Sequence, residues 1–183
     1  DTGVGALSLN FNLIQVHWRR PRPGAPIEAY ATSNSDNQEV PVDGVRFGPV
    51  PAGLGAAAPI VYSGGAQAGQ HWLLSPQLPA QGVTSLPVRD VGATTAAVFR
   101  RLCERAGIAL GDPQRGVAPP GAALLVRHDS PPLSNIVRNV LRFSNNLTAE
   151  LIGLAASRRL SGHGLPLAQS GAARTAWLRQ QLP

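Results

Sequence analysis

The amino-acid sequence predicts an α+β protein, because its two halves show different hydrophobic periods. Over residues 4–20, apolar and polar side chains alternate, which is the pattern of half-buried β-strands. From Thr94 onward, apolar residues recur every three or four positions, which is typical of amphipathic helices. We therefore expect a β-rich domain at 1–83 and a helical domain at 84–183.

The β-rich part is expected to contain several short strands. The first pattern, VGALSLNFNLIQVHWRR, has a slip near Ile14 that indicates a bulge. The turn-forming segment RPRPGAP then separates it from a second strand candidate, IEAYATSN at 27–34. Further apolar runs are bounded by Pro and Gly: VRFGPVPAGLG at 45–55, PIVYSGG at 59–65 and QHWLLSPQLP at 70–79.

The helical part begins with a helix predicted over 94–107. Val98 and Leu102 lie on one apolar stripe of this helix. Gly107 stands where a left-handed residue commonly ends a helix. The next apolar run, AALLVRH at 122–128, predicts a short strand.

Three more helices are predicted after Ser130, which can cap the first of them. Their apolar faces are found in LSNIVRNVLRF, LTAELIGLAASRRL and QSGAARTAWLRQQL. The pair Arg158-Arg159 falls in the last turn of the second helix, where positive charge is favourable. The polar trio Ser144-Asn145-Asn146 separates the first of these helices from the second.

The basic residues of this chain are all arginines, since the sequence contains 16 basic residues and no lysine. Arginine binds phosphate bidentately, so the net charge of +6 is compatible with nucleic-acid binding. However, the arginines are scattered, only 5% of the residues are aromatic, and Arg19-Arg20-Pro21-Arg22 is the one dense cluster. We therefore expect no specific nucleic-acid partner.

Several other kinds of site lack the residues they need. The single Cys103 excludes an internal disulfide framework, and the four histidines share no metal-ligand spacing, so no metal or other cofactor is expected. The segment GLGAAA at 53–58 matches a weak dinucleotide-binding fingerprint, but it lacks a clear strand before it and a helical pattern after it. No apolar run approaches the roughly 20 residues of a transmembrane helix.

The trio Ser144-Asn145-Asn146 allows two interpretations. In the first, its side-chain oxygens simply cap the free amides at the start of the second helix. The second comes from its surroundings, because HDSPPLSNIVRNVLRFSNNLTAELIG resembles one segment of the low-molecular-mass class C penicillin-binding proteins. These are the periplasmic D-alanyl-D-alanine carboxypeptidase/endopeptidases of the DacB type, in which S-P-P-L-S, a helix, and S-x-N followed by an apolar helix occur in this order.

The resemblance implies the helical part of a serine transpeptidase/β-lactamase-like domain, preceded by a β-rich inserted domain. In these terms Ser144 is a catalytic residue that relays a proton toward the leaving D-alanine. Asn146 binds the substrate, which is a peptidoglycan stem peptide or a β-lactam. Asn145 stands where the family commonly has Asp, which weakens the motif without breaking it.

The family also uses the motifs S-x-x-K and K-T-G, neither of which a chain without lysine can contain. We therefore expect an internal fragment of a periplasmic serine hydrolase that is inactive on its own. Its apolar helix faces are expected to meet a second copy or a complementary fragment. The alternative is a non-catalytic, arginine-rich module that binds anionic cell-wall polymer or nucleic acid, with the trio acting only as a cap.

Overall fold

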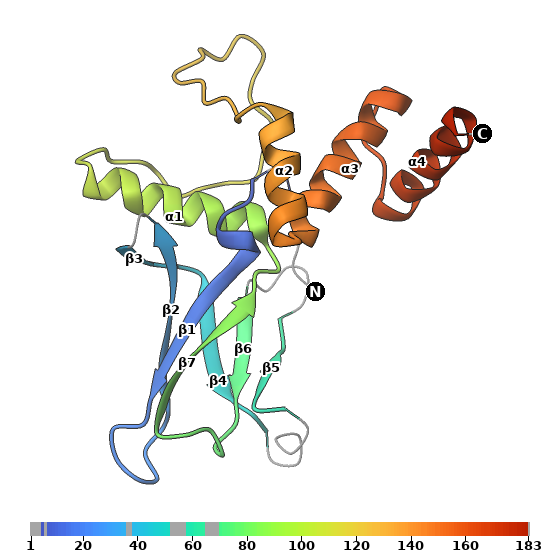
Figure 1. Cartoon of the computed structure of the whole chain (residues 1–183). Helices are drawn as coiled ribbons and strands as arrows, with labels where there is room; N and C mark the ends of the chain where they lie inside the picture. The colour runs from blue at the N-terminus through green and yellow to red at the C-terminus, as the bar shows by residue number, and fades with distance from the viewer. Residues whose placement is uncertain (1–4, 6, 36–37, 52–57, 65–69, 183) are drawn as a thin grey trace. The chain divides into compact units, whose positions relative to one another are not determined.

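The computed structural model describes residues 5, 7–35, 38–51, 58–64 and 70–182. It divides into two compact units, Asp1–Val117 and Ala118–Pro183, which we describe separately (Figure 1). The first unit contains the described strands and one α-helix, and the second contains three α-helices. The prediction of an α+β fold is therefore confirmed. The domain boundary between residues 83 and 84, which was expected from the change of hydrophobic period, stays a prediction.

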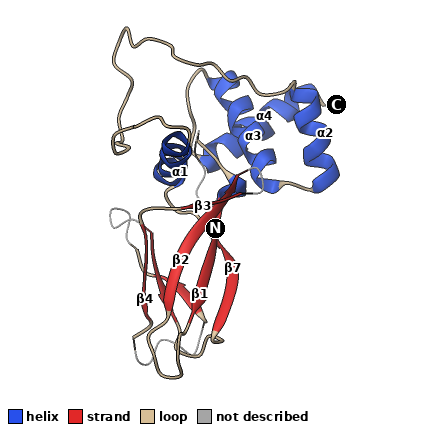
Figure 2. Ribbon diagram, turned by 90° about the vertical axis from the view of Figure 1, so that its left-hand side faces the viewer, coloured by secondary structure: helices blue, strands red, loops and turns tan. Residues whose placement is uncertain are grey.

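The first unit is built from two sheets and a helix. Its elements are β1 Leu13–Arg19, β2 Glu28–Ser35, β3 Gln38–Pro41, β4 Val45–Pro49, β5 Ile60–Tyr62, β6 Gln70–Leu74, β7 Gln81–Pro87 and α1 Val91–Arg105. One sheet is antiparallel with the strand order β3-β2-β1-β7, and Figure 2 shows its strands β2, β1 and β7 side by side. The other has the order β4-β6-β5, with β4 parallel to β6.

Strand β1 lies in the interior of its sheet because it offers one strongly apolar face. Ile14, Val16 and Trp18 are buried, whereas the side chains between them are only partly covered. Each such burial contributes about 1.5–3 kcal/mol. Helix α1 packs on the same core through Val91 and Val98. The alternation of apolar and polar residues that predicted this strand thus reflects the burial of one of its two faces.

The first strand is shorter than predicted, because a tight turn precedes it. The backbone of Asn10–Asn12 is left-handed, with φ between 49° and 57°. Asparagine tolerates this conformation better than most residues. The Asn12 carbonyl accepts a hydrogen bond from the Val88 N–H at 2.8 Å, which ties this turn to the chain just after β7. The predicted bulge is therefore a left-handed turn, and the alternation over 7–11 does not mark a strand.

Helix α1 begins and ends at residues whose chemistry suits those positions. The Asp90 carboxylate accepts a hydrogen bond from the Ala93 N–H at 3.2 Å and so caps the first turn. At the other end, Gly107 has a φ of 80° and its N–H bonds the Glu104 carbonyl at 3.0 Å. The left-handed glycine after this helix was predicted and is confirmed.

The second unit consists of α2 Leu133–Phe143, α3 Asn146–Ser161 and α4 Leu167–Gln181, so the three helices predicted after Ser130 are confirmed. The strand predicted over 122–128 is wrong, because this segment is irregular. A β-strand needs a hydrogen-bonded neighbour, and no described strand pairs with these residues. Its apolar side chains are left in solvent: Leu124, Leu125 and Val126 are 78%, 90% and 82% exposed.

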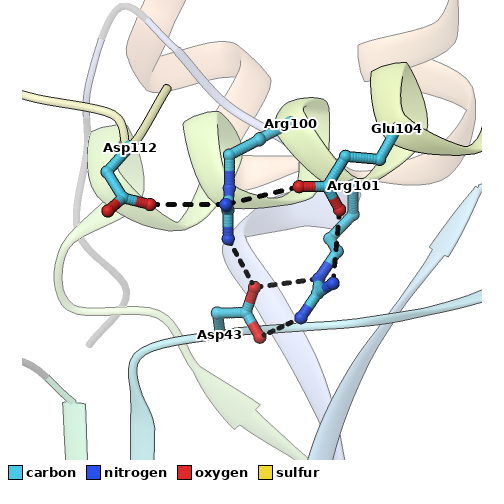
Figure 3. Close-up of polar contacts among 5 residues, drawn as sticks. All are labelled: Asp43, Arg100, Arg101, Glu104 and Asp112. Atoms are coloured by element: carbon cyan, nitrogen blue, oxygen red, sulfur yellow. Dashed lines mark hydrogen bonds and ion pairs between the residues drawn. The ribbon is translucent and has the colours of Figure 1, made fainter. Parts of the chain in front are cut away.

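An ion-pair cluster fastens α1 to the loop between β3 and β4 (Figure 3). Asp43 accepts from Arg101 Nε at 2.9 Å and from Arg101 Nη2 at 3.0 Å, so this pair is bidentate. Arg100 Nη2 approaches the same carboxylate at 3.3 Å. The hydrogen bond from Arg101 holds the pKa of Asp43 below its usual range. Glu104 and Asp112 complete the cluster through Arg100, each at 3.3 Å from Nη1.

The contact between Gly82 and Trp18 predicts a large cost for adding one methyl group. These residues are paired between β7 and β1, and a Cβ on Gly82 would clash with Trp18 Cζ2. The indole is buried and its Nε1 donates to the Pro79 carbonyl at 3.2 Å, so it cannot move aside freely. We expect Gly82→Ala to lower the free energy of unfolding by about 1–3 kcal/mol. Urea denaturation followed by tryptophan fluorescence measures this change.

The matched control is Gly92→Ala in α1, where an added Cβ meets nothing within 4 Å. Alanine favours a helix over glycine, so the urea midpoint of this control should stay the same or rise. Equal midpoints for the two variants would contradict the packing of Trp18 on Gly82.

The ion-pair cluster predicts how Asp43 contributes to stability across the pH range. Because its folded-state pKa is lowered, the ionised carboxylate stabilises the folded state above the ordinary value of 3.8, and this stabilisation is lost as pH falls through the folded-state pKa. We expect Asp43 to titrate below 3.8 in a carbon-13 NMR titration. Arg101→Gln should raise its pKa. The two side chains are well exposed, so the loss of stability at pH 7 should be small. An unchanged Asp43 pKa in Arg101→Gln would refute the assignment.

Candidate functional site

The candidate site is the corner at which α2 ends and α3 begins. Phe143 is the last residue of α2 and Asn146 the first of α3, so only two residues make the turn. Ser144 has φ 52° and ψ 44°, a left-handed conformation, and its N–H bonds the Val140 carbonyl. Such a conformation is uncommon for a residue other than glycine. It ends α2 abruptly and lets the chain start a new helix within two residues.

The middle residue of the trio caps α3. Asn145 Oδ1 accepts a hydrogen bond from the Thr148 N–H at 3.0 Å, and Asn145 has the extended backbone of an N-cap residue. Asparagine suits this position because its side chain can satisfy an amide that the helix leaves free. Capping by the trio was one of the two interpretations of the sequence, and the structure assigns that task to Asn145.

The two outer residues of the trio are left free by this arrangement. Ser144 and Asn146 are both exposed. Within the described part of the chain, neither the Ser144 hydroxyl nor the Asn146 amide has a hydrogen-bond partner. The corner therefore presents a hydroxyl and a carboxamide, two residues apart, to any molecule that approaches it. Their catalytic and substrate-binding roles stay a prediction.

Helix α3 is held against α4 by small polar residues. The Ser157 hydroxyl donates to Ser170 Oγ at 2.7 Å, and both side chains are fully buried. Gly153 lies one turn before Ser157 and is also buried. These residues allow the two helices to approach closely, and the hydrogen bond satisfies both hydroxyl groups. The helix that carries Asn146 is thus anchored at its middle by polar contacts rather than by an apolar core.

The second unit carries most of the chain's net positive charge. Residues 118–183 contain seven arginines and only two acidic residues, Asp129 and Glu150, which accounts for five of the six net charges. A surface of this sign attracts anions such as the carboxylate of a peptide C-terminus. The net charge of the two units therefore differs mainly because eight of the ten acidic residues lie in the first unit.

The described residues give little support to metal binding, dinucleotide binding or membrane spanning. His71 Nδ1 lies 2.9 Å from Ser63 Oγ and His17 Nε2 lies 3.0 Å from Thr32 Oγ1, so both have local partners. In the described ranges, no group of three or more His, Cys, Asp or Glu side chains is placed to hold a metal ion. The weak dinucleotide fingerprint at 53–58 lies largely outside the described residues. None of the described helices is long and apolar enough to cross a membrane.

The corner lies within a region that matches a known family. The model of the D-Ala-D-Ala carboxypeptidase 3 (S13) family matches residues 74–182. No curated protein matches the chain.

A solved structure has a similar fold. It is penicillin-binding protein 4 (dacB) from Haemophilus influenzae, complexed with a novel β-lactam. The similarity has a TM-score of 0.65 at 18% sequence identity and covers 99% of this chain. The chain spans 42% of the length of that protein.

The capping role of Asn145 predicts different effects for two substitutions. Asn145→Ala removes the acceptor for the Thr148 N–H and should lower the stability of α3 by about 1 kcal/mol. Asn145→Asp keeps an acceptor and adds a negative charge at the helix N-terminus, so stability should be retained. Thermal unfolding followed by far-ultraviolet circular dichroism compares them. Identical unfolding of the alanine and aspartate variants would show that Asn145 is not the cap.

Proposed function

The chain belongs to the D-Ala-D-Ala carboxypeptidase 3 (S13) family, and we propose that it forms part of a serine-type enzyme that cleaves D-alanine from peptidoglycan stem peptides. One observation carries the assignment of the site. Because Asn145 supplies the helix cap, the exposed Ser144 hydroxyl and Asn146 amide are available to a substrate.

Ser144 and Asn146 have distinct roles in the proposed reaction. In acyl transfer by a serine enzyme, a nucleophilic oxygen attacks the carbonyl carbon of the penultimate D-alanine, and the C–N bond to the last D-alanine then breaks. The leaving amine needs a proton, which the Ser144 hydroxyl relays to it. The Asn146 carboxamide donates a hydrogen bond to the peptide backbone and holds the acyl chain in place. Water then hydrolyses the acyl-enzyme and releases the shortened peptide.

The nucleophile and its base must come from other parts of the enzyme. The family uses S-x-x-K for these roles and K-T-G for the facing wall of the groove, and this sequence contains no lysine. The chain therefore supplies one wall of the active site and is inactive by itself. The positive charge of residues 118–183 supports this role, since the substrate carries a C-terminal carboxylate.

The apolar side chains of the second unit support a need for further protein. Leu133, Leu141 and Phe143 on α2 are 61%, 79% and 68% exposed. Exposed apolar side chains that gather on one helix commonly mark a surface that contacts other protein. The rest of the enzyme, or a second copy of the chain, fills this role. We place the reaction in the periplasm, where peptidoglycan is the substrate and β-lactams are inhibitors.

A second candidate function is a non-catalytic module that binds an anionic cell-wall polymer. Arg158 and Arg159 at the end of α3 favour it, because both are exposed and neither has an ion-pair partner among the described residues. In this case Ser144 and Asn146 would be dispensable for binding. Salt-dependent binding of the 183-residue chain to isolated wall polymer would support the module.

A fluorescent penicillin tests the proposed enzyme. The 183-residue chain should not be labelled covalently, because it lacks the nucleophile and its base. The full-length protein that carries these residues should be labelled at a single serine. Within it, Ser144→Ala should slow the release of product about 100-fold or more, in line with the loss of a proton-transfer group.

Asn145→Asp is the matched control within the trio, because it changes the neighbouring side chain and leaves the cap in place. Its labelling rate should equal that of the unchanged protein. Covalent labelling of the isolated chain, or full activity of Ser144→Ala, would refute the proposed function.

A further inference from the structure

One stripe of α3 connects the candidate site to α4. Asn146, Glu150, Gly153 and Ser157 are spaced four, three and four residues apart, so they lie on the same face of the helix. Ser157 and Gly153 are buried, Glu150 is half-buried and Asn146 is exposed. Asn146 therefore occupies the open end of a stripe whose remaining length faces other residues of the unit.

Arg174 of α4 lies along this stripe and bonds at two points. Its Nη2 lies 3.3 Å from Glu150 Oε1, one helical turn from Asn146. Its Nε donates to the Ser170 carbonyl at 3.3 Å, within its own helix. Ser170 in turn bonds Ser157 on α3. The guanidinium thus joins the first turns of α3 to the part of α4 that already packs against it.

Gly153 provides the space that the guanidinium occupies. A Cβ at this position would clash with Arg174 Nη1 and Cζ, so the guanidinium would have to shift to make room for it. The guanidinium of Arg174 therefore rests directly on the α3 backbone. A glycine inside a helix lowers helix stability relative to alanine. Gly153 therefore lowers the stability of α3 itself but allows Arg174 to make a close contact with it.

The geometry points to Arg174 as a positioning residue for Asn146. Arg174 forms an ion pair with Glu150 and lies against the backbone of Gly153. These two contacts fix the orientation of the first two turns of α3 and therefore the orientation of the Asn146 carboxamide. A lysine could not replace it, because one ammonium cannot bond Ser170 and Glu150 from two separate nitrogens of a planar group. This inference rests on the proposed function, since it acts through the substrate-binding role of Asn146.

The first test measures acylation of the full-length protein by a fluorescent penicillin. Arg174→Ala should reduce the second-order acylation rate about tenfold or more, because small misplacements of a substrate-binding group cost large factors in rate. Arg174→Lys should not restore it. The matched control is Arg179→Ala on the same helix, which removes the same charge at an exposed position and should acylate at the normal rate.

Gly153→Ala separates positioning from stability. The added methyl should displace the Arg174 guanidinium and slow acylation to a similar degree, while the melting temperature stays the same or rises because alanine favours the helix. In the double variant with Arg174→Ala, Gly153→Ala should cause no further loss of rate. A melting temperature that falls in proportion to the rate would show that the contact is merely structural and would overturn the inference.

A double-mutant cycle with Asn146→Ala distinguishes this inference from the proposed function. If Arg174 acts through Asn146, then Arg174→Ala should have little further effect once Asn146 is removed. An equal effect of Arg174→Ala in both backgrounds would refute the positioning role and leave the proposed function intact. Normal acylation by Asn146→Ala alone would refute the proposed role of Asn146, and the inference would fail with it.

Discussion

The hydrogen bond from the Thr148 N–H to Asn145 Oδ1 determines what the corner between α2 and α3 can do. A helix start leaves its first amides without partners inside the helix, and an N-cap side chain commonly satisfies one of them. Here the middle residue of the trio does so, and the left-handed backbone of Ser144 turns the chain before the cap is reached. The Ser144 hydroxyl and the Asn146 carboxamide therefore stay free, and the N-terminus of α3 is still capped.

The fold was predictable wherever a segment buries one face within its own unit. The alternation at Ile14, Val16 and Trp18 and the glycine after α1 both identified their elements correctly. Prediction failed where a strand has a weak apolar pattern of its own and forms by pairing with a neighbour. β3 pairs with β2, which directly precedes it in the sequence, and β7 pairs with β1, which lies far from it in the sequence. The apolar run at 122–128 has the composition of a strand, but the described residues offer it no strand to pair with.

The candidate site was predictable as a sequence motif but not as a geometry. Ser144 and Asn146 were proposed from their spacing and surroundings, and their roles stay a prediction. The identity of the cap required the backbone conformation at the corner. The contact of Arg174 with Glu150 and Gly153 joins two helices across 24 and 21 positions of sequence. No local pattern reports such a contact, because an arginine, a glutamate and a glycine on helices are each ordinary by themselves. The physical link appears only when the two helices pack.

The left-handed backbone at residue 144 also restricts which amino acids could supply a hydroxyl there. With a φ of 52°, a β-branched side chain would clash with its own main chain, so threonine is disfavoured although it carries the same functional group. Glycine would fit the turn but would bring no oxygen. Among the small hydroxyl-bearing residues, serine alone meets both demands. Serine at this corner thus combines a tolerable left-handed backbone with a free hydroxyl group.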